Sequence, residues 1–407
     1  MAIIKPFAAV RPQAELASRI CELPYDVVSS AEARQLAAGN DLSFFHVSKP
    51  EIDLPENTPL SNPAVYQKGA ESFQRLLKID ALKQDAQPCY YLYRQMSGVH
   101  IQTGLVAVAS CDDYRNGIIR KHEKTHPDKE EDRARHIEIL NAQTGPVFLV
   151  YPYNPNFNDL VSSQTKEPPD VDFQAVDGVH HTGWVINSPA LIRCIASIFA
   201  RIPHLYIADG HHRSAAAARV AESRPGDAHS NYFLCVLFPH TQVQIQAYNR
   251  VVKDLNGFTP AQFLDRIQSV CVLRARGESI PPHIHEFCLY LDHHWYALDF
   301  KPECFAAEDP VDQLDVSLLQ NLILAPVLDI DDPRTSRRIS FVGGIRGINA
   351  LERMVDSGDY ACAFSLYPTR IEDLMTISDA GKLMPPKSTW FEPKLRDGLF
   401  SYLLSGI

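Results

Sequence analysis

Between residues 204 and 219 the pattern of apolar and polar positions changes abruptly. An apolar run, Leu205 to Ala208, ends at Asp209-Gly210, and four consecutive alanines begin at residue 215. An apolar run closed by glycine is typical of a buried strand and turn, and alanine is the strongest helix former. The sequence therefore predicts a strand over 204–209, a glycine turn and a helix over 211–222.

Strand and helix patterns alternate through the rest of the first half. Apolar positions at helical spacing predict a helix over 64–79, and runs at 88–96 and 99–110 predict a hairpin through Ser97-Gly98. A charged amphipathic segment predicts a helix over 127–143, and the run PVFLVYPY predicts a buried strand over 146–153. This alternation indicates an α/β or α+β fold with mixed sheets.

The last third of the chain repeats this character as a C-terminal α/β lobe. A long apolar helix is expected at about 313–325, and strands at about 338–343 and 360–367. Thr369, with Glu372 three residues later, matches the capping box that opens a helix. At this length we expect three lobes, with bounds 1–150, 151–257 and 258–407.

The composition of the chain limits the kinds of molecule that it is expected to bind. The 407 residues include 39 basic and 49 acidic side chains, giving a net charge of −10, which argues against nonspecific nucleic-acid binding. No run reaches the ~18–20 apolar residues of a transmembrane helix. Nine cysteines are scattered without a C-x-x-C pair, as in a reducing compartment. We expect a cytoplasmic protein that binds a small molecule and no membrane; the composition leaves its oligomeric state open.

The predicted turn carries chemistry as well as structure. Asp209, Gly210, His211, His212 and Arg213 crowd the start of the helix, where backbone N–H groups are unpaired and the dipole is positive. Such a helix start binds phosphate, and arginine and histidine add donors. The alternative is a plain helix cap with the histidines and arginine facing water.

A second cluster precedes the helix expected at 127. His122 to His126 matches H-E-x-x-H, a zinc-protease signature that requires both histidines on one face of a continuous helix. Pro127 follows directly and disfavours the helical conformation at His126. The motif therefore straddles a helix start, and zinc hydrolysis with His122, His126 and a remote ligand is the least favoured function.

The same loop has two other interpretations. It could be a solvated charged loop without function. Alternatively, Arg120 and Lys121 could neutralise a phosphate while Glu123 serves as a base or as a metal ligand. Further along, Lys387 follows two prolines in MPPKSTWF and could close over a phosphate, or this segment could be a strap anchored by its aromatic residues.

Four separated motifs also carry a resemblance. PYDVV at 24–28, KHEKT at 121–125, LYIADGHHRSAAA at 205–217 and MPPKSTWFEPKL at 384–395 resemble a bacterial family of unknown function often labelled as ParB-related. More distantly, the strand–turn–helix is similar to the phosphate-binding turn of ParB, sulfiredoxin and the free-serine kinases. This resemblance implies a nucleotide phosphate at Asp209–Arg213, and it implies that Tyr25 and Asp26 line the site.

Three function classes follow. The favoured one is a phosphotransferase that uses ATP or ADP and Mg²⁺ on a small, serine-like hydroxyl metabolite, the substrate being implied by the resemblance. Glu123 and His212 would be catalytic, Asp209 would contact Mg²⁺, and the turn would hold phosphate. The second is a non-catalytic, ParB-like nucleotide-sensing or partner-binding protein. The third is the zinc hydrolase. No P-loop and no G-x-G-x-x-G is present.

Overall fold

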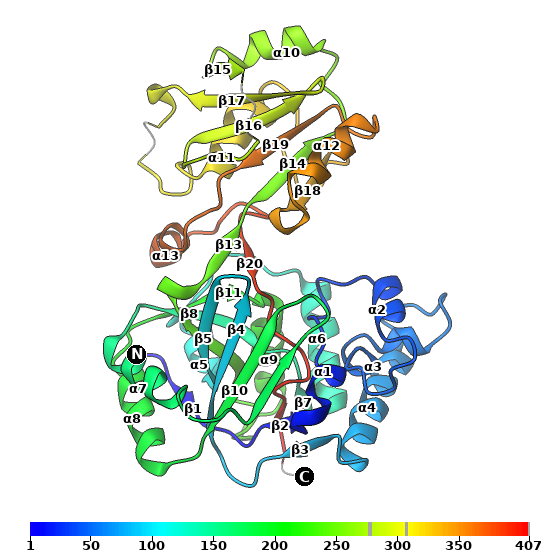
Figure 1. The fold of residues 1–407 in the computed structure, drawn as a ribbon, viewed down its shortest axis with the longest axis vertical. Helices are drawn as coiled ribbons and strands as arrows, with labels where there is room; N and C mark the ends of the chain where they lie inside the picture. Colours follow the sequence, from blue (N-terminus) through cyan, green and yellow to red (C-terminus); the bar gives the residue numbers. More distant parts are fainter. Residues whose placement is uncertain (276–278, 306–307, 406–407) are drawn as a thin grey trace. The chain divides into compact units, whose positions relative to one another are not determined.

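The computed structural model describes residues 1–275, 279–305 and 308–405, and it divides into two compact units (Figure 1). Unit 1 comprises Met1–Val243 and Pro393–Ile407, and unit 2 comprises Gln244–Glu392. Unit 2 is thus inserted into the chain of unit 1. Among the described residues, no helix is both long enough and apolar enough to cross a membrane.

Unit 1 is built around one mixed sheet. In pairing order its strands are β6 (Ile119–Arg120), β11 (Leu205–Asp209), β8 (Val147–Tyr151), β12 (Tyr232–Pro239), β5 (His100–Ser110), β4 (Tyr90–Ser97), β10 (His180–Ile186) and β9 (Val171–Gln174), with β1 (Ile4–Lys5) also paired to β5. The pairs β6–β11 and β8–β12 are parallel, and the other neighbours are antiparallel. The central strands are buried on both faces, which explains their nearly continuous apolar sequences.

Unit 1 contains nine α-helices in its described part. They are α1 (Ala17–Ile20), α2 (Ser30–Leu36), α3 (Phe45–Ser48), α4 (Pro63–Lys78), α5 (Cys111–Arg115), α6 (Pro127–Leu140), α7 (Pro155–Gln164), α8 (Pro189–Phe199) and α9 (His211–Ser223). Of these, α1, α5, α8 and α9 contact the strands of this sheet. Helix α9 packs against α6, and α6 packs against α4. The Asn62 side chain caps α4, and Phe73 and Leu76 are buried on its apolar face.

The predicted mixed α/β class is confirmed, and several individual elements match their expected ranges. The hairpin is β4–β5, the helix expected at 64–79 is α4, and the strand expected at 146–153 is β8. The division into lobes differs from the expected one. Strand β8 begins before the expected boundary at residue 151 and β12 lies beyond it, yet the two pair in parallel, so strands of the first two expected lobes share one sheet.

Unit 2 contains an antiparallel sheet. In pairing order its strands are β15 (Cys271–Ala275), β17 (His294–Phe300), β16 (Glu286–Leu291), β19 (Cys362–Leu366), β14 (Tyr248–Val252) and β18 (Ile339–Gly343). Its helices are α10 (Pro260–Ile267), α11 (Asp315–Leu319), α12 (Ile348–Asp356) and α13 (Ile371–Asp379). Strands β13 (Gln244–Gln246) and β20 (Trp390–Glu392) pair where the chain enters and leaves the unit.

Two expectations for unit 2 need correction. The long apolar helix expected at about 313–325 is not a continuous α-helix. Helix α11 ends at Leu319, and a π-helical turn, Gln320–Leu324, follows it directly. The capping box at Thr369 is wrong, because α13 begins one residue later than a Thr369 cap requires. The Thr369 hydroxyl instead donates to the Ser388 carbonyl oxygen at 2.8 Å and ties the MPPKST segment to the start of α13.

The C-terminal segment returns to unit 1 and is pinned there by polar contacts. Strand β21 (Tyr402–Leu403) pairs with β7 (Ala142–Gln143). The Arg396 side chain is buried, donates from Nε to His181 Nε2 at 3.0 Å and also pairs with Asp177. The hydroxyl oxygen of Tyr93 lies 2.8 Å from the other ring nitrogen of His181, Nδ1. Arg396, in the C-terminal segment, therefore packs against His181 of β10.

This contact predicts a pH dependence. Burial, together with Arg396, lowers the pKa of His181 to about 2, whereas a solvated histidine titrates near 6.5. Below about pH 6.5 the unfolded chain binds a proton at His181, but the folded chain does not. The contribution of His181 to the free energy of unfolding is therefore present above about pH 6.5 and is lost as the pH falls. From about pH 7.5 to 5, His181 alone should account for a loss of about 2 kcal/mol.

The change His181→Gln keeps an acceptor for Arg396 and removes the titration. In denaturant unfolding, the decrease in the free energy of unfolding from pH 7.5 to 5 should therefore be about 2 kcal/mol smaller in the variant than in the wild type. This holds even though the variant is less stable at neutral pH. The exposed His294, changed to Gln, is the control and should leave the difference unchanged. An unaltered pH dependence in His181→Gln would show that this ring is not held neutral.

Candidate functional site

The strand–turn–helix forms as the sequence predicts. Strand β11 ends at Asp209, Gly210 has a φ of +98°, and α9 begins at His211. A Cβ at Gly210 would lie 3.0 Å from Arg213 Nε, so glycine both permits the turn and leaves room for the guanidinium. Among the described residues, no side chain caps α9. The first N–H groups of α9 therefore lie at a helix start without a side-chain acceptor.

The Arg213 side chain does not face solvent. It is buried, and its NH1 group donates to the Pro146 carbonyl oxygen. Its NH2 group lies 3.6 Å from Asp209 Oδ2 and 3.7 Å from Asp26 Oδ2. Burial alone would lower the pKa of Arg213, but Asp26 and Asp209 more than compensate, and its pKa lies above the ordinary value. The guanidinium is a fixed charge that organises the turn.

Asp209 shares its carboxylate between two cations. Lys394 Nζ lies 3.3 Å from Asp209 Oδ2, the same oxygen atom that Arg213 approaches. Burial would raise the pKa of Asp209, but Lys394 and Arg213 outweigh it and hold this pKa below the usual range. Asp209 is therefore ionised at neutral pH and is already partly neutralised by its neighbours.

The loop with the KHEKT motif lies against the turn. Strand β6 pairs in parallel with β11, and this pairing places the loop beside the start of α9. The His122 backbone N–H donates to His211 Nε2 at 3.4 Å, and the His126 N–H donates to His212 Nε2 at 3.1 Å. Two segments about 85 residues apart in the sequence are thus joined by main-chain hydrogen bonds to imidazoles.

The structure also shows why H-E-x-x-H is not a helical zinc motif here. His126 is the extended N-cap residue of α6, which begins at Pro127. His126 stacks on His212, with ring centroids 6.0 Å apart, while His122 lies edge-to-face with His211 at 4.4 Å. The two histidines of the motif therefore contact different residues of α9.

The candidate base Glu123 lies beside His211. Its Oε2 atom is 3.7 Å from His211 Nδ1, and half of its side chain is exposed. Because a backbone N–H donates to Nε2 of His211, the neutral ring carries its proton on Nδ1, the side that faces Glu123. Burial, with a further contribution from His122, lowers the pKa of His211 well below its ordinary value, so the ring is neutral. Burial also lowers the pKa of His122 to about 4.

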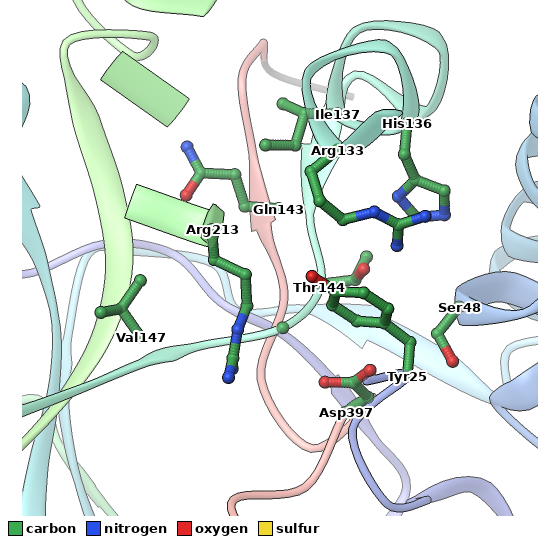
Figure 2. Close-up of a pocket in the computed structure, with 11 residues that line it drawn as sticks. Tyr25, Ser48, Arg133, His136, Ile137, Gln143, Thr144, Val147, Arg213 and Asp397 are labelled. Atoms are coloured by element: carbon green, nitrogen blue, oxygen red, sulfur yellow. The ribbon is translucent and has the colours of Figure 1, made fainter. Parts of the chain in front are cut away.

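A small, partly open pocket lies beside Arg213 (Figure 2). Its walls include Tyr25, Arg133 and Asp397, and Arg133 stacks over the Tyr25 ring at 4.1 Å. Burial raises the pKa of Asp397 to about 7, although Arg213 opposes the shift. The cavity volume is about 30 Å³, which is enough for ordered water. Arg213 therefore lies between the turn and this pocket.

Three predicted phosphate ligands take other positions. Lys121 Nζ lies 3.6 Å from the centre of the Tyr114 ring, and burial lowers its pKa. Arg120 NH2 lies 3.4 Å from His204 Nε2. Lys387 belongs to unit 2, where its ammonium lies 5.7 Å from the centre of the Tyr248 ring and its carbonyl oxygen accepts from Arg250.

Several residues near the Asp209–Arg213 turn were not predicted from the sequence pattern. Lys394 lies in the same motif as Lys387, MPPKSTWFEPKL, and nothing in the pattern of the motif distinguishes the two lysines. Asp26 was implied only by resemblance, and it faces Arg213. Asp397 and Arg133 carried no signal at all. These residues come from distant segments, so only the tertiary fold identifies them.

Comparisons with known proteins give a family and a distant likeness. Residues 4–317 match a family described as a protein of unknown function, DUF1015. No curated protein matches the chain. The similar solved structures include a free serine kinase variant in complex with AMP, with 14% identity and a TM-score of 0.37, covering 70% of this chain and 86% of that one.

Two further solved structures are similar to the same degree. Truncated SbnI from Staphylococcus aureus has 11% identity and a TM-score of 0.40, covering 73% of this chain and 87% of that one. A conserved hypothetical protein from Pyrococcus furiosus has 13% identity and a TM-score of 0.36, covering 76% and 97%. Because these TM-scores are low, we derive the function below from the geometry of this chain.

The turn itself can be tested by stability. Gly210→Ala should destabilise the protein by roughly 1–3 kcal/mol through its positive φ. It should cost more than Gly39→Ala, because the added methyl also meets Arg213 whereas Gly39, with a φ of +74°, has open space around it. Thermal unfolding of both variants measures the difference. Equal losses would show that the approach of Arg213 to Gly210 contributes nothing.

Proposed function

The chain belongs to the DUF1015 family, a family of unknown function, and we propose that this member is a nucleotide-dependent phosphotransferase. It would use ATP or ADP and transfer a phosphoryl group to a small hydroxyl metabolite. The observation that carries the proposal is the start of α9. There the helix N-terminus has no side-chain cap, the ammonium of Lys394 contacts Asp209 at the end of β11, and the carboxylate of Glu123 lies beside His211.

The phosphate would bind at the α9 N-terminus. The N–H groups of His211, His212 and Arg213 point out of the helix start, the dipole favours an anion, and Gly210 lets a phosphate approach the backbone. His212 adds a donor, because its Nε2 accepts from the main chain and the proton of the neutral ring is therefore on Nδ1. The resemblance of this turn to known phosphate-binding turns agrees with this placement.

The charges around the turn explain the need for a divalent cation. Arg213 and Lys394 are balanced by Asp26 and Asp209, so the fixed charges alone do not attract a polyphosphate. Mg²⁺ prefers oxygen ligands and keeps several waters, and one or two carboxylates with phosphate oxygens suffice. Asp209 can supply one such carboxylate, which leaves Glu123 free of the Mg²⁺ ion. When bound, Mg²⁺ would neutralise charge on the phosphoryl group.

The transfer step itself needs few protein groups. The hydroxyl oxygen of the substrate forms a bond to the terminal phosphorus, and the bond from that phosphorus to the bridging oxygen of the nucleotide breaks. The bonding electrons leave with the nucleotide, and the hydroxyl proton moves to Glu123. The Nδ1–H of His211 faces Glu123 and keeps its carboxylate oriented, while the helix start holds the phosphate.

A serine-like substrate and a cytoplasmic setting complete the proposal. The substrate class comes from the resemblance to free-serine kinases, and the free thiols of the nine cysteines agree with a reducing compartment. The second candidate is a ParB-like protein that binds nucleotide at the same turn without transfer. The net charge of −10 argues against a nucleic-acid partner in either case.

Lys394 tests the phosphate site. Changing Lys394 to Gln removes one positive charge beside the turn and leaves Asp209 with one cation fewer, so binding of ADP should weaken about tenfold, or ~1.4 kcal/mol. Calorimetry with Mg²⁺ and ADP measures the change. Lys124→Gln, an exposed lysine on the neighbouring loop, is the charge-matched control and should bind like the wild type. Equal affinities for the two variants would exclude phosphate from this side of the turn.

Glu123 tests the chemistry. Glu123→Gln preserves the shape of the side chain and removes the base, so turnover should fall by ~10²–10⁴ with little loss of nucleotide affinity. The assay follows conversion of ATP or ADP with Mg²⁺ and a panel of serine-like hydroxyl metabolites. Binding without turnover across the panel would favour the sensing candidate. Full activity of Glu123→Gln would remove Glu123 from the mechanism.

A further inference from the structure

Three side chains beside the turn form a group, and the phosphotransfer reaction leaves one of them, His122, without a role. His122, Glu123 and His211 each offer one ligand atom, and these atoms all lie within 4.8 Å of one another. Two of the three are buried, His122 at 3% and His211 at 4% exposure. Buried imidazoles facing a carboxylate, with two nitrogens and one oxygen, make up a donor set that transition metals favour.

The orientation of His122 supplies a second, independent observation. Its Nδ1 atom is buried and has no hydrogen-bond partner in the part of the chain that the structure describes. The ring also interacts with the backbone of Ile207, which raises its pKa against the larger effect of burial. A metal-bound histidine almost always donates its second nitrogen to a carbonyl or carboxylate, which fixes the ring and leaves the first lone pair for the ion.

The geometry points to a site for one divalent transition-metal ion, such as Zn²⁺, held by His122, Glu123 and His211. This ligand set differs from H-E-x-x-H, because His126 is outside the group and contacts His212. It also differs from the Mg²⁺ position of the proposed reaction, because Mg²⁺ prefers oxygen ligands and this site offers two nitrogens. Three protein ligands leave at least one position open for water or a substrate group.

Binding requires a modest rearrangement. Ligand atoms at about 2.1 Å from a tetrahedral Zn²⁺ lie about 3.4 Å apart, so the group must contract by up to about 1.4 Å. Glu123 is half-exposed on a loop and can supply that movement. His211 would bind through Nδ1, move its proton to Nε2 and give up the long hydrogen bond from the His122 N–H. One weak bond is exchanged for a metal–nitrogen bond.

Occupancy has a consequence for the proposed reaction. A carboxylate bound to a metal ion cannot also accept the substrate proton, so the metal-bound form and the form with Glu123 as base exclude each other. A bound Zn²⁺ should therefore suppress phosphotransfer even in the presence of Mg²⁺. The metal site itself does not rest on the proposed function, because its ligands are present whether or not nucleotide binds.

The test uses the full chain, freed of metal by a chelator, in buffer without nucleotide. Calorimetry with Zn²⁺, and absorption spectra with Co²⁺ as a probe of nitrogen and oxygen ligands, should show one equivalent bound that a hundredfold excess of Mg²⁺ does not displace. His122→Gln and His211→Gln should each lose at least tenfold in affinity. Glu123→Gln, which changes a half-exposed side chain and keeps the fold, should do the same.

His126→Gln is the matched control, since it removes the other histidine of the same loop. It should bind Zn²⁺ like the wild type. An equal loss in His126→Gln, equal binding in the wild type and the three ligand variants, or no binding at all would each overturn the site. Because no nucleotide is used, these outcomes are independent of whether the protein transfers phosphate. Thermal unfolding of each variant establishes that a lost signal reflects lost ligands.

Discussion

A buried guanidinium must be surrounded by acceptors, and Arg213 draws them from separate parts of unit 1. Its partners are the Pro146 carbonyl oxygen ahead of β8, Asp209 at the end of β11 and Asp26 near the N-terminus. Asp397, from the C-terminal return, faces it across the small pocket. Removing any one acceptor would leave the buried charge less compensated, so these segments are fixed together and fix the start of α9.

The histidines around this charge serve as neutral hydrogen-bonding groups. His211 and His212 accept main-chain N–H groups from the loop that contains Glu123, and burial keeps their pKa values below the ordinary one. An imidazole that accepts at one nitrogen must hold its proton on the other, so the loop sets the direction in which each ring can donate. The same contacts that join the loop to the helix thereby aim His211 at Glu123.

Local sequence predicted the elements well, and it predicted the turn best. Asp209-Gly210 followed by polyalanine defines both the end of β11 and the start of α9, because glycine conformation and helix propensity are local properties. Pro127 likewise predicted where α6 begins, and the helix does begin at this residue. The capping box at Thr369 failed because that hydroxyl has a tertiary partner, the Ser388 carbonyl oxygen, which a three-residue pattern cannot reveal.

The composition of the site was less predictable for the same reason. The two motif lysines, Lys387 and Lys394, are seven residues apart, but the boundary between the units falls between them. Lys387 belongs to unit 2, whereas Lys394 belongs to unit 1 and contacts Asp209 there. The three-lobe division failed to anticipate that β8 and β12 pair in one sheet. Pairing between distant strands and ion pairs between distant segments are decided by the whole fold, and single-sequence patterns carry little of that information.

The central claim is that the α9 N-terminus binds the phosphates of a nucleotide. The most direct measurement is a nitrogen–proton correlation spectrum of protein labelled with ¹⁵N only at histidine, recorded while Mg²⁺ and ADP are added. The backbone amides of His211 and His212 should show the largest shifts, because their N–H groups would donate to phosphate. The amides of His293 and His294, in the hairpin of unit 2, should not move. Saturable ADP binding that leaves the two α9 amides unshifted would contradict the account.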